Sequence, residues 1–312
     1  DPHTPPPERS RPAEENIAEI AELVAGGVRD VTLLGQTVNS WHEPGVEAEA
    51  AKRESKTAAS TSQFAALLRR IAREVPELLR LRYTSPHPRH ITSELVAAHA
   101  DLELLPAHVH LPVQSGSDRV LRRMARRYTA EDYVTRADAL KAARAGLTLS
   151  ADFIVGFPGE TEEDFEQTLD LVKRVGFVAA FAFKYSPRPY TPALKLGDEV
   201  AEEVKDERLA RLFSVVETQQ QAHLRSLVGR ELQVLIEGPS PGDTGRFAGR
   251  SERNEIVHLV APEGCDPTGE LVTVTIDEPF RHSLSGYMRG AEHRDVGGRR
   301  TRLSVLDAGG SV

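Results

Sequence analysis

The stretch from residue 107 to residue 128, AHVHLPVQSGSDRVLRRMARRY, contains three kinds of side chain that could each do chemistry. His108 and His110 are two residues apart, so both would project from one face of a strand as metal ligands can. The loop from Gln114 to Ser117 offers amide and hydroxyl groups to a polar small molecule, and Gly116 would let that ligand approach closely. The five arginines that follow have the spacing of one helix face, which suits nucleic-acid phosphates: Arg119, Arg122, Arg123, Arg126 and Arg127.

The metal interpretation is the weakest of the three. The two histidines begin their strand, whereas barrel enzymes place their ligands at strand ends. His87 and Asp152 are the remaining candidates, and no spacing singles them out. We therefore interpret both histidines as structural and predict no metal site. For the other two features, ordinary turn chemistry and a solvated helix face stay open as alternatives.

Composition limits the class of protein. The chain has 312 residues, 39% hydrophobic and 28% charged, with a net charge of −8, which argues against a uniformly basic nucleic-acid binder. Basic residues nevertheless outnumber acidic ones between residues 118 and 144, by eight to four. The single cysteine excludes an internal disulfide framework. No apolar run could span a membrane, and the first residues lack the apolar segment of a signal peptide. We expect a cytoplasmic monomer that does not bind membranes.

Residues 14–226 alternate between helical and strand-like patterns, with five strand-to-loop units. Such alternation predicts an α/β fold with a parallel sheet and right-handed crossovers, here a partial (β/α) barrel of the TIM-like kind. In that architecture the chemistry lies in the loops after the strands. All five loops are polar or rich in Gly and Pro: 35–39, 84–87, 114–117, 156–160 and 186–188.

The pattern changes after the long helix predicted over 201–227. Residues 227–290 form short strands separated by Gly, Pro and Asp, which predicts a small all-β barrel. This segment has a cluster of polar residues within nine positions that could contact RNA: Arg246, Arg250, Arg253 and Asn254. An ordinary solvated loop is the alternative. We expect residues 1–13 and 291–312 to be disordered.

Several motifs together resemble one family over roughly residues 2–290. VTLLGQTVNSW, RYTSPHP, HLPVQSGSDRVLRRMARRY, ADFIVGFPGETEEDFEQTLDLV and FAFKYSPRPYTPA occur in the order and spacing of the radical S-adenosylmethionine tRNA methylthiotransferases. The form LLGQTVN resembles the branch that acts on N6-isopentenyladenosine beside the anticodon. The segments VLIEGPS, GRSERNEIVHL and HSLSGYM resemble the TRAM domain of that family, a small RNA-binding β-barrel.

The resemblance implies an enzyme that transfers a methylthio group to C2 of the modified adenine. In the family, a reduced [4Fe–4S] cluster cleaves S-adenosylmethionine to start radical chemistry, and a second [4Fe–4S] cluster holds the sulfur. The implied partners are the anticodon stem-loop of tRNA and a sulfur donor. We expect the tRNA to meet the helix that carries Arg122 and Arg126. The residues expected to line the S-adenosylmethionine pocket are Gln36, Asn39, Gln114, Ser115 and Asp152.

The cluster ligands of the family have no counterpart in this sequence. Family members carry three cysteines in an N-terminal domain and a Cys-x3-Cys-x2-Cys loop, and PHTPPPERSRP resembles the segment just after that loop. The single cysteine, Cys265, matches neither set. We therefore expect a chain that begins after the loop, binds no cluster and is inactive alone. A non-catalytic RNA-binding fragment and a metal-dependent barrel hydrolase are the alternatives.

Overall fold

The computed structural model describes residues 10–44, 63–187, 191–241 and 245–288. We predicted disorder at residues 1–13 and 291–312. Residues 1–9 and 291–312 lie outside the described residues, as does Arg188 of the last predicted loop. Residues 10–13 are described, and Ala13 is buried and begins the first helix, so the prediction was wrong there. None of the described helices is both long and apolar enough to cross a membrane.

Helices and parallel strands alternate through the first part of the chain, as predicted. The helices are α1 (Ala13–Ala25), α3 (Gln63–Glu74), α4 (Ser93–Asp101), α5 (Asp118–Arg123), α6 (Ala130–Ala143), α7 (Glu162–Val175) and α8 (Glu202–Ser226). The strands are β1 (Asp30–Leu33), β2 (Arg80–Tyr83), β3 (His108–His110), β4 (Thr148–Val155) and β5 (Ala179–Lys184). Short 3-10 turns are η1 (Val38–Ser40), η2 (Pro88–His90) and η3 (Pro192–Lys195).

Local sequence explains several helix boundaries. The Thr129 hydroxyl accepts from the Asp132 N–H, and the Asp132 carboxylate accepts in return from the Thr129 N–H, so α6 begins with a capping box. Thr161 and Asp164 make the same arrangement at the start of α7. Gly176 ends α7 in the left-handed conformation, which glycine adopts without strain.

The five parallel strands do not form the single sheet that the alternation predicts. β1 pairs with β2, and β3, β4 and β5 form a separate sheet. The ladder breaks because the Leu81 N–H of β2 donates to the Leu104 carbonyl, in the segment before β3. Pro106, also in that segment, has no N–H to offer to a ladder. The two short sheets still share one hydrophobic core beneath the helices, which includes Leu81, Val109 and Phe153.

A closed five-stranded barrel follows α8, in the order β10-β8-β7-β6-β9. Its strands are β6 (Glu231–Pro239), β7 (Phe247–Ser251), β8 (Ile256–Val260), β9 (Leu271–Pro279) and β10 (Ser283–Met288). Alternating apolar residues fill a core of its own, with Val234, Val257 and Val274 fully buried. Gly249 is required here, because a Cβ atom at this position would lie 2.3 Å from the Leu235 carbonyl oxygen.

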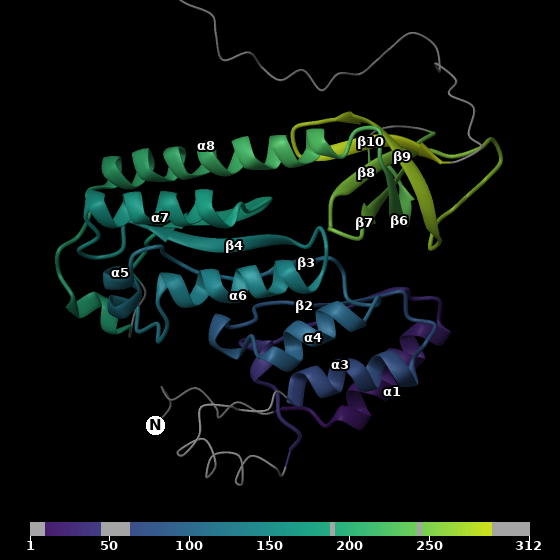
Figure 1. Ribbon diagram of the computed structural model, residues 1–312, viewed down its shortest axis with the longest axis horizontal. Coiled ribbons are helices and arrows are strands. Elements are labelled where there is room, and N and C mark those ends of the chain that lie inside the picture. The colour runs from purple at the N-terminus through teal and green to yellow at the C-terminus, as the bar shows by residue number, and fades with distance from the viewer. Residues whose placement is uncertain (1–9, 45–62, 188–190, 242–244, 289–312) are drawn as a thin grey trace, which may run out of the picture.

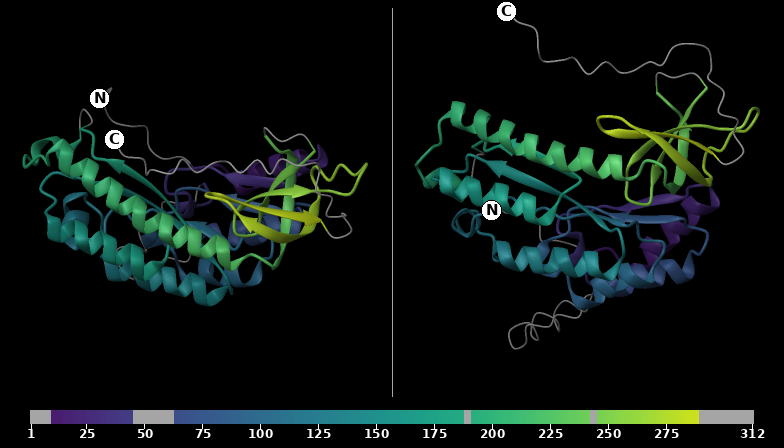
Figure 2. Two further views of the ribbon diagram at one scale, coloured as in Figure 1. Left: turned by 90° about the horizontal axis from the view of Figure 1, so that it is seen from above. Right: turned by 45° about the horizontal axis from the view of Figure 1, so that its top comes forward.

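The small barrel lies where α8 ends, next to the N-terminal ends of the parallel strands (Figures 1 and 2). Its β7–β8 loop, residues 252–255, contacts the first part of the chain directly. The Ala107 N–H donates to the Glu252 carbonyl at 2.8 Å, and Arg253 Nε donates to the Gly146 carbonyl at 2.9 Å. The two parts of the chain therefore meet in a hydrogen-bonded seam.

Candidate functional site

The face of β3, β4 and β5 that turns away from the helices is polar, and we call it the inner face. Alternate residues of each strand project to it, while Val109, Ala151 and Ala182 point to the core. Strand register places His108 beside Thr148 and His110 beside Ser150. We predicted the two histidines to be ordinary structural residues, and the polar wall that they form with Thr148 and Ser150 was not predicted. The sequence does carry a signal of this wall, because polar residues occupy every second position of β3 and of the first part of β4.

A chain of hydrogen bonds runs along the inner face. His108 Nδ1 lies 2.8 Å from Thr148 Oγ1, and its Nε2 lies 3.0 Å from Ser150 Oγ. Ser150 Oγ also lies 2.9 Å from His110 Nδ1, and His110 Nε2 lies 3.2 Å from Asp152 Oδ1. The Asp152 carboxylate at the end of the chain is about one-third exposed. This arrangement fixes the orientation of Asp152 and leaves it able to accept a hydrogen bond from a ligand.

Burial lowers the pKa of His108 to about 4. The imidazole is therefore neutral at pH 7, and it carries one N–H donor and one acceptor. The neighbouring hydroxyls of Thr148 and Ser150 can each take the complementary role. The inner wall is thus a neutral polar surface that ends in one carboxylate, which suits a ligand with several hydrogen-bonding groups.

Two phenyl rings border this wall on the edge strand β5. Phe181 and Phe183 are 58% and 59% exposed, although phenylalanine is usually buried in a soluble protein. The Phe181 ring lies 5.7 Å from the His110 ring, edge to face, and Phe181 pairs in register with Asp152. A flat aromatic ligand could stack on such rings while its edge reaches the polar groups.

A cavity of about 220 Å³ lies beside the wall, where the two sheets separate. Arg82 enters it from β2 and pairs with Asp30 at 2.9 Å. Its Nη1 donates to Asn254 Oδ1 at 2.9 Å, while its Nη2 is buried without a partner among the described residues. The small barrel therefore contributes Asn254 to the lining of this cavity.

We predicted that the Gln114–Ser117 loop offers its polar groups to a ligand, but several of them are used within the protein. Ser115 is fully buried, and its hydroxyl contacts Thr168 of α7 at 3.3 Å. A Cβ atom on Gly116 would lie 2.5 Å from the Gln167 carbonyl oxygen. Gly116 is therefore needed for close packing of the loop on α7, and our expectation that it admits a ligand was wrong. Gln114 is half-buried, and its side chain makes no hydrogen bond among the described residues.

Two residues of the loop after β1, Gln36 and Asn39, were predicted to line the pocket. The side chain of Asn39 makes hydrogen bonds to another loop, whereas that of Gln36 makes none among the described residues. Asn39 is buried, its Nδ2 donates to the His87 carbonyl at 3.0 Å, and its Oδ1 accepts from the His87 N–H at 2.7 Å. Asn39 thus fastens the loop after β1 to the loop after β2. Gln36 is exposed beside it.

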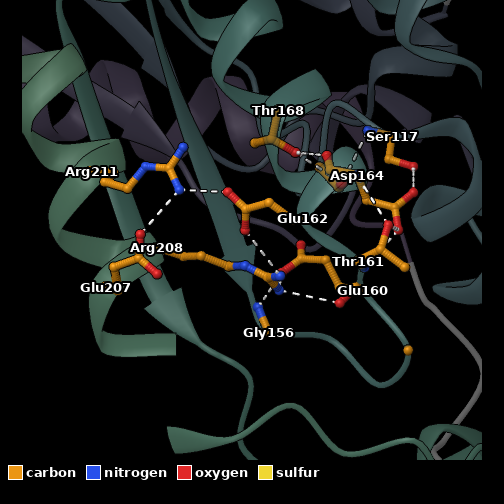
Figure 3. A network of polar contacts seen from close by, with 12 residues as sticks. Ser117, Gly156, Glu160, Thr161, Glu162, Asp164, Thr168, Glu207, Arg208 and Arg211 are labelled. Carbon is orange, nitrogen blue, oxygen red and sulfur yellow. Dashed lines mark hydrogen bonds and ion pairs between the residues drawn. The ribbon is translucent and has the colours of Figure 1, made fainter. Parts of the chain in front are cut away.

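The loop after β4, Gly156–Glu160, is held by a buried ion pair (Figure 3). Glu160 Oε2 accepts from the Gly156 N–H at 2.6 Å and pairs with Arg208 Nη1 of α8 at 2.9 Å. Burial is the largest influence on the pKa of Glu160 and raises it. Because Arg208 pairs with the Glu160 carboxylate, that carboxylate is not available to a ligand.

The acidic residues in the first turn of α7 also form ion pairs with arginines. Glu162 pairs with Arg211 of α8 at 2.6 Å, and Asp164 pairs with Arg119 of α5. Asp164 Oδ1 also accepts from Ser117 Oγ at 2.6 Å. The hydrogen bonds from Arg119, Ser117 and Thr161 outweigh the effect of burial and lower the pKa of Asp164. These acidic residues support the loops around the strand ends and leave little negative charge for a ligand.

The prediction that five arginines lie on one face of a single helix is wrong. The helix α5 ends at Arg123, and Ala125 adopts a left-handed conformation with φ of 56°. Arg126 and Arg127 therefore lie beyond the helix. Arg119 is committed to Asp164, and Arg123 Nε donates to the Pro158 carbonyl at 3.0 Å. Arg122 is exposed on α5.

The predicted RNA residues of the small barrel divide into two groups. Arg253 and Asn254 lie in the seam, because Arg253 donates to Gly146 and Asn254 accepts from Arg82. Arg246 is half-buried near Ser285. Arg250 pairs with Glu237 at 3.1 Å and keeps about a third of its side chain exposed. The cluster is therefore not one open loop.

A metal centre finds no support among the described residues, where no group of three His, Cys, Asp or Glu side chains could hold an ion. No observation favours a barrel hydrolase. Cys265 is exposed in the segment between β8 and β9.

The comparisons with known proteins agree with this architecture. The family model described as the radical SAM superfamily matches residues 2–172. A Sorangium cellulosum protein named tRNA-2-methylthio-N(6)-dimethylallyladenosine synthase is 56% identical over 296 residues, which cover 93% of this chain and 59% of that protein. A protein of the same name from Acidithiobacillus ferrooxidans is 45% identical over 285 residues, covering 91% of this chain and 60% of that protein. The chain thus spans about three fifths of the length of these relatives.

Among solved structures, the chain resembles the coproporphyrinogen III oxidase of Escherichia coli with a TM-score of 0.43 and 14% identity, over 74% of this chain and 70% of that one. The family match covers more than half of the chain and includes β3 and β4 of the inner face, while β5 lies beyond it. The chain therefore belongs to the radical SAM superfamily.

Proposed function

We propose that this chain is the catalytic and RNA-binding portion of an enzyme that methylthiolates C2 of N6-isopentenyladenosine in tRNA. The names of the two relatives and the motif set support the reaction. The observation that carries it here is the inner face, where exposed phenyl rings stand beside the Asp152 carboxylate. The small barrel is proposed to be a TRAM domain that contacts the anticodon stem-loop.

In this proposal, the inner face receives the flipped-out adenine. Enzymes that act on a base within structured nucleic acid remove it from its stack and hold it between aromatic side chains. Phe181 would stack on the ring, and Asp152 would accept from a donor such as the N6-H. His110 and Ser150 keep Asp152 in place. The expected cytoplasmic location, the monomeric state and the sulfur donor are part of the same proposal.

The groups at the strand ends fit S-adenosylmethionine in part. The amide side chains of Gln36 and Gln114 make no hydrogen bond in the described structure, and Asp152 is partly open. Ser115 and Asn39 hydrogen-bond to Thr168 and His87, and we propose that neither contacts the ligand directly. Bound S-adenosylmethionine and iron–sulfur clusters would supply the radical chemistry of the whole enzyme.

A [4Fe–4S] cluster does not fit the residues of this chain. Such clusters are held by several cysteine thiolates, and the 312 residues contain one cysteine, in the small barrel. The chain in isolation is therefore proposed to bind ligand and RNA but not to react.

The complete open reading frame that contains this chain provides the direct test. It would be expressed in bacteria that lack tRNA methylthiotransferase activity, and tRNA nucleosides would be analysed by mass spectrometry. We expect 2-methylthio-N6-isopentenyladenosine with the wild type and much less with Asp152→Asn or Phe181→Ala. Arg73→Ala, on the outer helix α3, is the matched control and should leave the product unchanged. Wild-type protein that accumulates normally and forms no methylthiolated adenosine would contradict the proposal.

A further inference from the structure

We propose that a cationic rim beside the inner face, made of Arg89, Arg126 and Arg136 around the rings of His87 and His90, binds phosphates of the RNA backbone. The proposal rests on the proposed function, and it gives the bound RNA a surface on the partial barrel in addition to the small barrel.

Two segments that are distant in sequence, residues 87–90 and 126–136, form this rim. His87 follows β2, and its ring lies 5.7 Å from that of His90 and 5.5 Å from that of Tyr128. Arg89 begins its turn by donating its N–H to His87 Nδ1 at 3.2 Å. Arg126 lies two residues before Tyr128, and the Arg126 backbone N–H donates to the Leu121 carbonyl at 2.8 Å. Backbone N–H groups make these contacts of Arg89 and Arg126, so the guanidinium groups of both arginines stay available.

The charged side chains that act most strongly on the His87 ring are cationic. Burial is the first cause that lowers the pKa of His87 to about 4, and the further causes are Arg126, His90, Arg89 and Arg136, all of them cationic. Because His87 is neutral at pH 7, the charge of the rim comes mainly from its three arginines.

Two of the rim arginines, Arg89 and Arg126, differ from several other arginines near the strand ends. Arg119, Arg208 and Arg211 are each paired with a carboxylate. The guanidinium groups of Arg89 and Arg126 make no hydrogen bond or ion pair among the described residues. Arg136 donates to the Asp132 carbonyl at 2.9 Å and is partly balanced by the Asp132 carboxylate. Unpaired arginines gathered in a protein of net charge −8 indicate an anionic partner.

The position of the rim identifies that partner as RNA. Asn39 anchors the His87 backbone, and the Tyr128 hydroxyl donates to the Val113 carbonyl, next to Gln114. The rim therefore lies at the strand ends, beside the loops that border the inner face. A phosphate bound there would hold the strand on which the reacting nucleotide lies. Arginine contacts to phosphates set register without reading sequence.

The test measures the affinity of the 312-residue chain for an RNA anticodon stem-loop hairpin at several sodium chloride concentrations. The double variant Arg89→Ala/Arg126→Ala should weaken binding by about three- to tenfold per arginine and should reduce the salt slope by about one to two. Arg89→Lys/Arg126→Lys keeps the charge and should keep the slope. Arg73→Ala is the matched control, since it removes one exposed arginine at the end of α3, near the start of β2 and away from the rim.

The outcomes separate this inference from the proposed function. If wild-type protein binds the hairpin and the double alanine variant binds it with the same affinity and slope, the rim does not contact RNA, while the proposed function stands. If wild-type protein shows no salt-dependent RNA binding at all, the result contradicts the RNA substrate of the proposed function, and with it the inference that the rim binds RNA. Sodium phosphate should displace the hairpin no better than sodium chloride of equal ionic strength. A much stronger effect of phosphate would assign the rim to a free phosphate ligand and overturn the inference.

Discussion

Arg208 and Arg211 allow the effect of burial on an ion pair to be measured within one helix. Both project from α8 over the Phe165 ring, at 5.6 and 5.0 Å from its centroid, and both contact Glu162. They differ in exposure, because the Arg208 side chain is 5% exposed and the Arg211 side chain 34%. The partner of Arg208, Glu160, is also buried, with 1% of its side chain exposed.

The substitutions Arg208→Met and Arg211→Met preserve most of the apolar stem and remove the charge. Loss of one partner from a buried pair leaves the other charge unpaired, which costs about 3–5 kcal/mol. Arg208 Nε has no hydrogen-bond partner among the residues that the structure describes. Removal of this arginine therefore also relieves one unsatisfied group, and we expect the lower end of that range. Arg211 and its partners are partly exposed, so its loss should cost about 0–1 kcal/mol.

Urea unfolding at pH 7, followed by circular dichroism, measures both free energies. With a slope of about 2–3 kcal/mol per molar urea, Arg208→Met should lower the midpoint by about 1–2 M, and Arg211→Met by less than about 0.5 M. The double variant Arg208→Met/Glu160→Gln should regain part of the loss, because no unpaired charge remains. Equal losses for the two arginine variants would refute the argument from burial.

Four further predictions concern other parts of the chain. Burial lowers the pKa of both His99 and His108 to about 4, below the unfolded value near 6.5, so the unfolded chain takes up protons first and stability should fall as pH drops from about 6.5 towards 4. The loss should reach about 2 kcal/mol per histidine at pH 5, and equal urea midpoints at pH 7 and pH 5 would contradict it. Gly116→Ala should destabilise the fold by about 1–3 kcal/mol, while the control Gly26→Ala, whose Cβ atom would lie 3.3 Å from its nearest neighbour, should be nearly neutral in the same unfolding assay. Anaerobic reconstitution of the 312-residue chain should yield no stoichiometric iron, and a broad visible absorption band would show this to be wrong. Ser115→Ala should leave S-adenosylmethionine affinity in calorimetry unchanged, and a tenfold loss would return Ser115 to the pocket.

Features set by neighbouring residues were predictable from the sequence. The Thr129 cap of α6 depends on a residue three positions away, and the structure confirms it. The alternation of helices and strands and the closed β-barrel after α8 follow from local periodicity in the same way. The end of α5 was not predictable from the same kind of pattern. It depends on the left-handed conformation of Ala125, which a residue with a Cβ atom seldom adopts.

Features set by distant partners were not predictable. Ser115 looked like a ligand group, but its partner Thr168 lies 53 residues further along. Asn39 meets His87 at a separation of 48 residues, and Arg253 meets Gly146 at 107. In each case the side chain has the chemistry of a binding residue, and the fold uses it to join two elements. Only the packing of the loops decides between those two uses.

The long helix α8 connects both ends of the proposed site (Figure 1). Near its start, Arg208 and Arg211 hold the loop after β4 and the first turn of α7. Near its end, His223 pairs at 2.6 Å with Glu255, whose neighbour Asn254 accepts from Arg82 in the cavity beside the inner face. The loops at the strand ends and the small barrel are therefore attached to one rigid element. An RNA that contacted both the barrel and the rim would be held at a fixed distance from the inner face, as transfer to a single position of one base requires.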